Sequence, residues 1–361
     1  MPSDVTTILL TGAGAPGTRG TIYALRKGSE SEKRKIRLVG VDMKKGAVGR
    51  FWVDAFHVVP PPESEEYAGE MNRICAKESV DVIIPQTTRE SAKLSECMSE
   101  INSRITVSPS QAMRKANNKF ELMRLFESLS LPTPKYFLVR ALADLIDRAE
   151  ELGYPDKAVV VKPPVSHGSR GFRVLRENTS WTIRRFLSEK PSAPEITLDE
   201  LSKILTKDKH VDFPELLVTE FLPGREYSVD AFIGKAAEIA LPRLRKEIVN
   251  GISFRTTVER RRDIEEYTLK AARALGLRYA FGFQFKLDYS DVPKVLECNP
   301  RVQGTMVASV FAGANVIWWA VKEALGERTP RVKDLKVSES DFYRYWGGLA
   351  LLPDGSLLGE I

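Results

Sequence analysis

The sequence predicts an α/β protein that begins with a doubly wound parallel sheet and continues in α+β units. Up to about residue 112, short β-branched runs alternate with polar amphipathic stretches, which is typical of parallel strands joined by helices. Farther along, strand-like runs, helical patterns and two expected hairpins follow one another, which is typical of α+β units. The 361 residues are enough for two or three domains, each with its own core.

The first region has four strand-like runs, namely TTILLTG, KIRLVGVD, VDVIIPQ and RITVSP. The pattern Gly12-x-Gly14-x-x-Gly17 follows the first run, and Asp42 ends the second run, at about the spacing of a dinucleotide-binding fingerprint. Pro16 and Gly20 argue against a clean helix start at this point. We interpret the stretch as the first β-to-α turn of the sheet. An NAD(P)-dependent oxidoreductase is the alternative, and it would rest on these glycines and Asp42 alone.

The second region begins with a predicted helix over residues 113–130, which Pro132 and Pro134 end. A strand KYFLV, a helix DLIDRAEELG, a strand AVVVKPP, a polar loop SHGSRG and a strand FRVL are expected next. Residues 177–213 are highly charged and contain one helical stretch, LDELSKIL, so we expect a variable insertion here.

The third region has strand-like runs in ELLVTEFLPG, EYSVDAFI and KAAEIALPRL, followed by the helical pattern IEEYTLKAARALG. The runs YAFGFQFKLD and PKVLECNPR, separated by YSDV, predict a hairpin. A second hairpin is expected at the end of the chain, turning at Pro353-Asp354-Gly355.

The composition is that of a soluble globular protein, with 43% hydrophobic and 28% charged residues. The net charge of +6 comes from basic residues mixed with acidic ones, and no common nucleic-acid motif is present, so we expect no nucleic acid partner. The apolar tract 312–321 is too short to cross a bilayer, and we expect a cytoplasmic protein with no membrane partner. Trp318 and Trp319 in this tract belong to the core or to an oligomer interface, and a homo-oligomer stays open.

Cys75, Cys97 and Cys298 are odd in number and far apart, so neither a disulfide framework nor a zinc site is indicated. We expect three reduced cysteines that serve in packing.

The second region ends one strand with Lys162, just before a loop that carries Gly168 and Gly171. A lysine at this place can hold phosphate oxygens while backbone N–H groups close over them. Downstream, Glu220 ends a strand and Glu226 follows a Pro-Gly turn. Such a segment can offer backbone groups to an adenine edge and a carboxylate to ribose hydroxyls. The alternatives are an ordinary strand end and two exposed glutamates beside a turn.

Gln284, Glu297 and Asn299 lie on the two strands of the predicted hairpin. Glu297 and Asn299 are two positions apart, so they share one face of their strand, and the partner strand can add Gln284. All three offer oxygen atoms, which Mg²⁺ accepts when substrate phosphates complete its shell. Because a strand in an apolar run seldom carries Glu and Asn without a partner, we favour a metal site.

Arg243, Arg245 and Lys246 precede a glycine turn at residues 250–251. On a strand, Arg243 and Arg245 point the same way, which suits binding of a carboxylate or a phosphate. A solvated basic face is the alternative, above all for Lys246.

Taken together in this order, the segments VVVKP, LLVTEFLPGREYSVD and ECNPR resemble the ATP-grasp superfamily, and most closely the ATP-binding modules of the carbamoyl-phosphate synthetase large chain. The resemblance covers nearly the whole chain. It implies an N-terminal Rossmann-like parallel sheet domain over residues 1–112, followed by an ATP-grasp fold of two α+β subdomains. The small lid subdomain would span residues 113–225 and the core subdomain, with the C-terminal hairpin, residues 226–361.

The resemblance also implies an activity. Members of this superfamily bind ATP and two Mg²⁺ ions, phosphorylate a carboxylate to an acylphosphate, and let an amine or similar nucleophile displace the phosphate. We therefore expect an ADP-forming, Mg-dependent ligase with small-molecule carboxylate and amine substrates. A nucleotide-binding protein without catalysis is a further alternative.

Carried over by position, the resemblance assigns these residues to three kinds of role. Arg245 and Arg301 would be catalytic, and Gln284, Glu297 and Asn299 would bind the Mg²⁺ ions. Residues binding ATP would be Lys119, Lys162, Ser166, Gly168, Ser169, Gly171, Glu220, Leu222 through its backbone, and Glu226. The chain departs from many relatives in having His167 and Arg170 in the loop and a neutral residue at Gln284. The neutral Gln284 would weaken one Mg²⁺ site.

Overall fold

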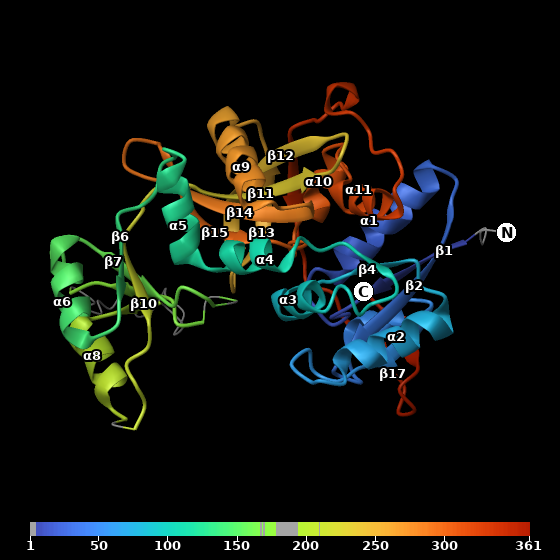
Figure 1. Ribbon diagram of the computed structural model, residues 1–361, viewed down its shortest axis with the longest axis horizontal. Helices are drawn as coiled ribbons and strands as arrows, with labels where there is room; N and C mark the ends of the chain where they lie inside the picture. The colour runs from blue at the N-terminus through green and yellow to red at the C-terminus, as the bar shows by residue number, and fades with distance from the viewer. Residues whose placement is uncertain (1–4, 167, 169, 178–193, 209) are drawn as a thin grey trace. The chain divides into compact units, whose positions relative to one another are not determined.

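In the computed structural model (Figure 1), the chain folds into two compact units. Unit 1 comprises Met1–Asn117, Arg225–Phe285 and Glu297–Ile361, and unit 2 comprises Asn118–Gly224 and Lys286–Leu296. The structure describes residues 5–166, 168, 170–177, 194–208 and 210–361. The three predicted domain spans stay a prediction.

The N-terminal part of unit 1 is a five-stranded sheet with the order β3-β2-β1-β4-β5. Its strands, all parallel, are β1 (Val5–Leu10), β2 (Lys35–Asp42), β3 (Ala55–Val58), β4 (Val82–Ile84) and β5 (Arg104–Ile105). The surrounding helices are α1 (Thr18–Ser31), η1 (Val48–Phe51), α2 (Tyr67–Glu78), α3 (Thr88–Glu96) and α4 (Ser110–Asn117). The predicted parallel sheet is confirmed, with β3 as an additional strand.

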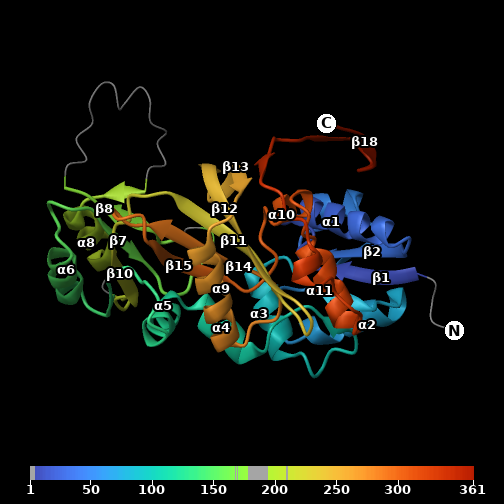
Figure 2. The same ribbon diagram turned by 90° about the horizontal axis from the view of Figure 1, so that it is seen from above.

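Alternation along β1 shows why helices cover both faces of this sheet. Ile8 and Leu10 belong to one core cluster with Leu25 of α1, whereas Leu9 belongs to another with Met71 of α2 and Leu94 of α3. Because successive side chains of a strand point to opposite faces, the apolar run needs a cover on each side. Figure 2 shows α1 and α2 on opposite sides of β1 and β2.

The glycine loop after β1 is a tight turn that leads directly into α1, so the expectation of an unclear helix start was wrong. Gly12 has a φ of +57°, and the N–H of Ala15 donates to its carbonyl at 2.8 Å. Helix α1 begins at Thr18, and a Cβ on Gly17 would lie only 2.8 Å from the Cα of Gly304. Glycine is therefore needed for the turn and for close backbone packing.

Unit 1 also contains most of a six-stranded sheet with the order β15-β14-β11-β12-β13-β16. Its strands are β11 (Glu226–Ile233), β12 (Glu238–Val249), β13 (Ile252–Val258), β14 (Tyr279–Leu287), β15 (Pro293–Asn299) and β16 (Ser340–Tyr343). The predicted β14–β15 hairpin is confirmed. The remaining elements are α9 (Arg262–Leu275), α10 (Val307–Phe311), α11 (Val316–Leu325), η2 (Val332–Asp334) and the predicted terminal hairpin of β17 (Leu349–Leu351) and β18 (Leu357–Glu360).

The two tryptophans of α11 are core residues. Trp318 and Trp319 are only 2% and 4% exposed, and their cluster includes Phe232 of β11 and Leu25 of α1. A Cβ on Gly28 would lie 2.2 Å from the Trp318 ring, so α1 and α11 approach closely at this glycine. Of the alternatives left open by the sequence, the core is correct and the interface is not.

Unit 2 is built on a five-stranded sheet with the order β6-β10-β7-β8-β9. Its elements are α5 (Lys119–Ser128), β6 (Tyr136–Val139), α6 (Leu142–Glu151), β7 (Val159–Lys162), β8 (Arg173–Leu175), β9 (Glu195–Ile196), α8 (Leu198–Thr206) and β10 (Leu216–Glu220). Apolar residues of α6 and α8 pack on β7 and β10. The charged segment 177–213 lies partly outside the described residues, and its predicted helix is α8.

The predicted helix over residues 113–130 is two helices. Helix α4 ends at Asn117, and the side chain of Asn118 accepts hydrogen bonds from the N–H groups of Phe120 and Glu121, which starts α5. This capping interaction takes the place of continued helical hydrogen bonding and sets Lys119 at the first position of α5.

The three cysteines are buried and free, as expected for packing residues. Within the described part of the chain, none of the helices has the length and apolar character needed to cross a membrane.

Candidate functional site

The predicted site residues fall into two sets. Unit 2 carries Lys119, Lys162, Ser166, Gly168, Gly171, Glu220 and Leu222. Unit 1 carries Glu226, Arg245, Gln284, Glu297, Asn299 and Arg301. Ser169 and His167 lie outside the described residues.

Two buried lysines lie beside the predicted phosphate loop in unit 2. Lys162 ends β7 and is 7% exposed, and Lys119 at the start of α5 is 6% exposed. The Nζ of Lys119 lies 3.4 Å from both the carbonyl oxygen and the Oγ of Ser166. The N–H of Lys119 donates to the carbonyl of Pro164 at 2.9 Å, which ties α5 to the segment after β7. Two cationic side chains next to one glycine-bearing loop suit a phosphate ligand.

The loop after Lys162 contains two glycines in the left-handed region, with φ of +61° at Gly168 and +73° at Gly171. A Cβ on Gly171 would lie 2.7 Å from the ring of Pro163, so the loop turns back onto its own start. Positive φ at these positions turns backbone N–H groups in directions that other residues rarely allow, which is a common way to surround a phosphate.

The segment after β10 carries the predicted adenine edge. The side chain of Glu220 accepts from the N–H of Lys135 at 2.9 Å, and Leu222 is 4% exposed. Between them, the Phe221 ring lies 5.0 Å from the Arg176 guanidinium and 5.3 Å from the Lys286 ammonium. Arg176 and Lys286 could not be singled out from the sequence, because Arg176 follows β8 and Lys286 lies in β14, both far from residue 221 along the chain.

In unit 1, one arginine joins two of the predicted ligand-binding side chains. Arg245 of β12 forms an ion pair with Glu226 of β11, and its Nη1 lies 3.4 Å from the Oε1 of Gln284 on β14. Its Nε donates to Ser253 at 2.9 Å and its Nη2 to the carbonyl of Gly251 at 2.6 Å. The guanidinium therefore links the predicted ribose and metal positions. This connection was not foreseen from the sequence.

The predicted metal ligands Glu297 and Asn299 lie on one face of β15, next to β14 with Gln284. The Nδ2 of Asn299 donates to Glu297 Oε1 at 3.0 Å, so the amide oxygen and carboxylate oxygens are held close together. Cys298 between them points into the core, and burial raises the pKa of its thiol well above the ordinary value. One carboxylate and two amide oxygens fit a Mg²⁺ ion that keeps water and phosphate ligands. Among the described residues, no group of three or more His, Cys, Asp or Glu side chains is arranged to hold a metal ion.

Arg301 follows β15 and lies next to these oxygens. Its Nη2 is 3.4 Å from Asn299 Oδ1, its Nη1 donates to the carbonyl of Val302 at 2.8 Å, and its Nε donates to Thr88 Oγ1 at 3.1 Å. Loss of hydration lowers the pKa of the guanidinium, and the charge of Glu297 opposes this shift.

Arg243 differs from Arg245 in its surroundings. It is 1% exposed, and its Nε and Nη2 donate to the carboxylate of Asp230 at 2.6 and 2.8 Å. Asp230 also accepts a hydrogen bond from Ser309. Arg243 is thus part of a buried ion pair in the core, and of the two arginines only Arg245 retains the expected place beside other site residues.

Asp42, the acidic residue on which the dinucleotide alternative depends, forms hydrogen bonds with nearby backbone groups. Asp42 Oδ2 accepts from the N–H of Gly14 at 2.8 Å, and Oδ1 accepts from the N–H of Lys44 at 2.9 Å. Glu90 is buried beneath Gly12, and this burial raises the pKa of its carboxyl group despite a hydrogen bond from Thr87. Both oxygens of Asp42 thus have backbone partners, which accounts for its position without a ribose.

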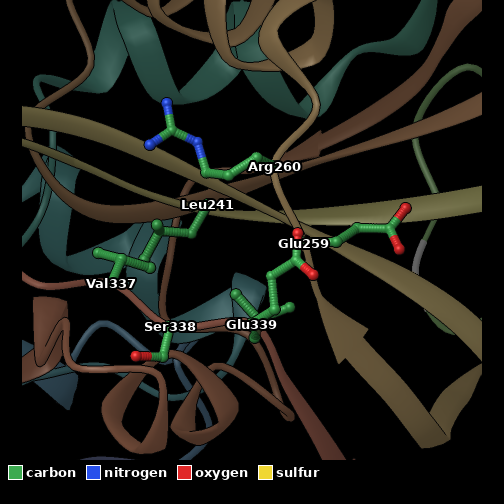
Figure 3. Close-up of a pocket in the computed structure, with 7 residues that line it drawn as sticks. Leu241, Glu259, Arg260, Val337, Ser338 and Glu339 are labelled. Carbon is green, nitrogen blue, oxygen red and sulfur yellow. The ribbon is translucent and has the colours of Figure 1, made fainter.

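A small cavity in unit 1, drawn in Figure 3, lies elsewhere. It is lined by Leu241, Val258, Glu259, Arg260, Val337, Ser338 and Glu339, and none of these is a predicted site residue. Its volume of about 10 Å³ is the room of one water molecule.

Comparison with known proteins identifies the architecture. A family model described as "ATP-grasp in the biosynthetic pathway with Ter operon" matches residues 212–341. The carbamoyl phosphate synthase large chain of Clostridium perfringens (strain SM101 / Type A) is 24% identical over 288 residues, which are 76% of this chain and 24% of that protein. The same protein of Clostridium botulinum (strain Kyoto / Type A2) is 26% identical over 280 residues, 74% of this chain and 24% of that one. This chain therefore matches about a quarter of the length of these curated relatives.

Solved structures agree. N5-carboxyaminoimidazole synthetase from Staphylococcus aureus, complexed with ADP, superposes with a TM-score of 0.67 at 16% identity, covering 96% of this chain and 82% of that one. The biotin carboxylase–βγ-ATP complex from Campylobacter jejuni superposes with a TM-score of 0.69 at 17% identity, covering 97% and 77%. The chain has the ATP-grasp fold. The resemblance drawn from the sequence motifs is thereby confirmed, as is the fold class.

Within the ATP-grasp fold, the roles given to individual residues stay predictions. The structure brings Glu226, Arg245 and Gln284 together, and it brings Glu297, Asn299 and Arg301 together. It also places Lys119 beside the loop that follows Lys162.

Proposed function

We propose that this ATP-grasp chain is a Mg-dependent, ADP-forming ligase that joins a carboxylate to an amine or related nucleophile through an acylphosphate. The observation that carries the proposal is the group of oxygen donors Gln284, Glu297 and Asn299 on neighbouring strands, with Arg301 in contact with Asn299. Carboxylate and amide oxygens with a neighbouring guanidinium suit a metal–phosphate ligand.

The ATP-binding roles are proposed residue by residue. Lys119 and Lys162 would neutralise phosphate charge, and the loop with Ser166, Gly168 and Gly171 would cover the phosphates; Ser169 belongs to the same proposal. Glu220 and Leu222 would meet the adenine edge, Leu222 through its backbone, and Glu226 would bind ribose. Lys119 and Lys162 are both buried, and Lys119 contacts Ser166 of the loop after Lys162, which supports a common role at the phosphates.

The chemistry would be mostly positioning and electrostatics. Bound Mg²⁺, with two ions expected, would neutralise charge on the phosphate oxygens. A substrate carboxylate oxygen attacks the γ-phosphorus in line, the bond to the ADP oxygen breaks, and an acylphosphate forms. The nucleophile then attacks the acyl carbon, gives up a proton and displaces phosphate. Arg301 would stabilise charge on the transferred group.

Arg245 would stabilise the acylphosphate or its tetrahedral successor. Its ion pair with Glu226 and its contact with Gln284 support a second role. In this role Arg245 would position the side chains of Glu226, proposed for ribose, and Gln284, proposed for Mg²⁺. The substrates would be two small molecules, a carboxylate and an amine or related nucleophile. A cytoplasmic location and a homo-oligomeric state are also proposed.

A thermal-shift titration with Mg·ATP, Mg·ADP, NAD and NADP tests the binding part of the proposal, since a ligand of the folded state raises the melting temperature. The adenine nucleotides with Mg²⁺ should raise it and the dinucleotides should not. A rise with NAD or NADP alone would contradict the proposal.

Turnover is tested by ADP release in a screen of carboxylates paired with amines. Glu297→Gln should abolish ADP release, whereas Glu247→Gln, a matched change on the exposed part of β12, should have no effect. Binding of Mg·ATP without ADP release in any pair would favour the alternative of a nucleotide-binding protein without catalysis.

A further inference from the structure

Arg301 is fixed by three partners, of which one comes from a distant part of the chain. The carbonyl of Val302 and the side chain of Asn299 belong to the segment of Arg301 itself, whereas Thr88 is 213 residues away in the sequence. Thr88 Oγ1 accepts from Nε at 3.1 Å, the nitrogen that joins the guanidinium plane to the rest of the side chain. A hydrogen bond at Nε therefore fixes the direction of the whole plane.

Thr88 is itself held rigidly by the N-terminal sheet. It is the first residue of α3, two residues after Gln86 in the short connection from β4, and it is 7% exposed. The preceding residue, Thr87, caps the helix by accepting the N–H of Glu90, and Ser91 donates to the carbonyl of Thr87 at 2.7 Å. The Thr88 hydroxyl thus has little freedom to follow a moving arginine.

We infer that Thr88 is a positioning residue for the phosphate-binding arginine, so that the N-terminal sheet sets the orientation of Arg301. The inference rests on the proposed function, because it needs Arg301 to meet the terminal phosphate of ATP. An arginine held by a neighbouring hydroxyl loses less side-chain entropy when it binds a phosphate than one that must first be ordered. Thr88 then acts on phosphate recognition without touching the nucleotide.

The test compares two nucleotides that differ in the terminal phosphate. Dissociation constants are measured by calorimetry for Mg·ADP and for the Mg complex of the non-hydrolysable β,γ-methylene analogue of ATP. Thr88→Val keeps the shape of the side chain and removes the acceptor, and Thr88→Ser restores it. Thr268→Val is the matched control, since Thr268 is fully buried in α9 and its hydroxyl has no hydrogen-bond partner among the described residues.

Thr88→Val should weaken binding of the ATP analogue about tenfold, the loss expected for one hydrogen bond to a charged group, and leave Mg·ADP binding unchanged. Thr88→Ser should bind like the wild type, and so should Thr268→Val. In protein with ¹⁵N-labelled arginine, the Nε–H signal that Arg301→Lys removes should shift and exchange faster with water in Thr88→Val.

Two results would overturn the inference, and they are distinguishable. If Arg301→Lys weakens binding of the ATP analogue but Thr88→Val does not, Arg301 works without Thr88. If Arg301→Lys has no effect, or the wild type binds neither nucleotide, then the proposed role of Arg301 itself fails and Thr88 has no phosphate site to support.

Discussion

The buried ion pair between Asp230 and Arg243 provides a quantitative test of the assignment of Arg243 to the core. Asp230 is 0% exposed and Arg243 is 1% exposed, and two charged hydrogen bonds of 2.6 and 2.8 Å join them. In Asp230→Asn the guanidinium stays buried without a counter-charge. Removing one partner of such a pair costs about 3–5 kcal/mol of unfolding free energy. At roughly 2–4 °C per kcal/mol, the melting temperature should fall by about 6–20 °C.

The assay is thermal unfolding, with two controls. The double variant Asp230→Leu with Arg243→Met removes both charges and should recover much of the loss, because an apolar pair leaves no unpaired ion. Asp199→Asn breaks an exposed pair, in which both side chains are 73% exposed, and should leave the melting temperature unchanged. A normal melting temperature for Asp230→Asn, combined with a lost response to Mg·ATP, would instead identify Arg243 as an anion-binding residue.

Further outcomes are expected. Gly17→Ala should destabilise the protein measurably in chemical denaturation, because its Cβ would lie 2.8 Å from Gly304 Cα; Gly69→Ala, where a Cβ has open space, is the matched control and should not. Lys162→Met should weaken Mg·ATP binding at least tenfold in calorimetry, while Lys157→Met, outside the predicted site, should not. Because the pKa of Glu90 is raised in the folded state, folding favours the protonated form of its carboxyl group. Stability from this group is full below the ordinary pKa of 4.5 and is lost as the pH rises through the folded-state pKa. Chemical denaturation at several pH values should show the unfolding free energy of Glu90→Gln rising relative to that of the wild type as the pH rises. A difference in unfolding free energy that does not change with pH would contradict this expectation.

Much of the fold could be predicted because it follows from local patterns. The alternation of Ile8, Leu9 and Leu10 between two cores is what a parallel strand covered on both faces requires. The break between α4 and α5 was missed, since the helical spacing continues through Asn118 and only its side-chain cap stops the helix. Strand β3 was missed because a run of four residues gives too short a pattern.

The candidate site was predictable where residues are close in sequence and less so where partners are distant. Glu297 and Asn299 share a face because they are two apart on a strand, which the sequence alone predicts. The pairing of Arg243 with Asp230 depends on the register of β11 and β12, and the contact between Thr88 and Arg301 spans 213 residues. Such long-range contacts depend on tertiary packing, which no local spacing encodes.

We expect this chain to bind Mg-adenine nucleotide through Glu297 and its neighbours. The decisive measurement is a calorimetric titration of the wild type and of Glu297→Gln with Mg·ATP, each repeated with EDTA in place of Mg²⁺ and with NAD. The wild type should bind Mg·ATP and not NAD, Glu297→Gln should bind Mg·ATP at least tenfold more weakly, and the two proteins should become alike without Mg²⁺. Equal affinity of both proteins for Mg·ATP, or binding of NAD alone, would contradict this expectation.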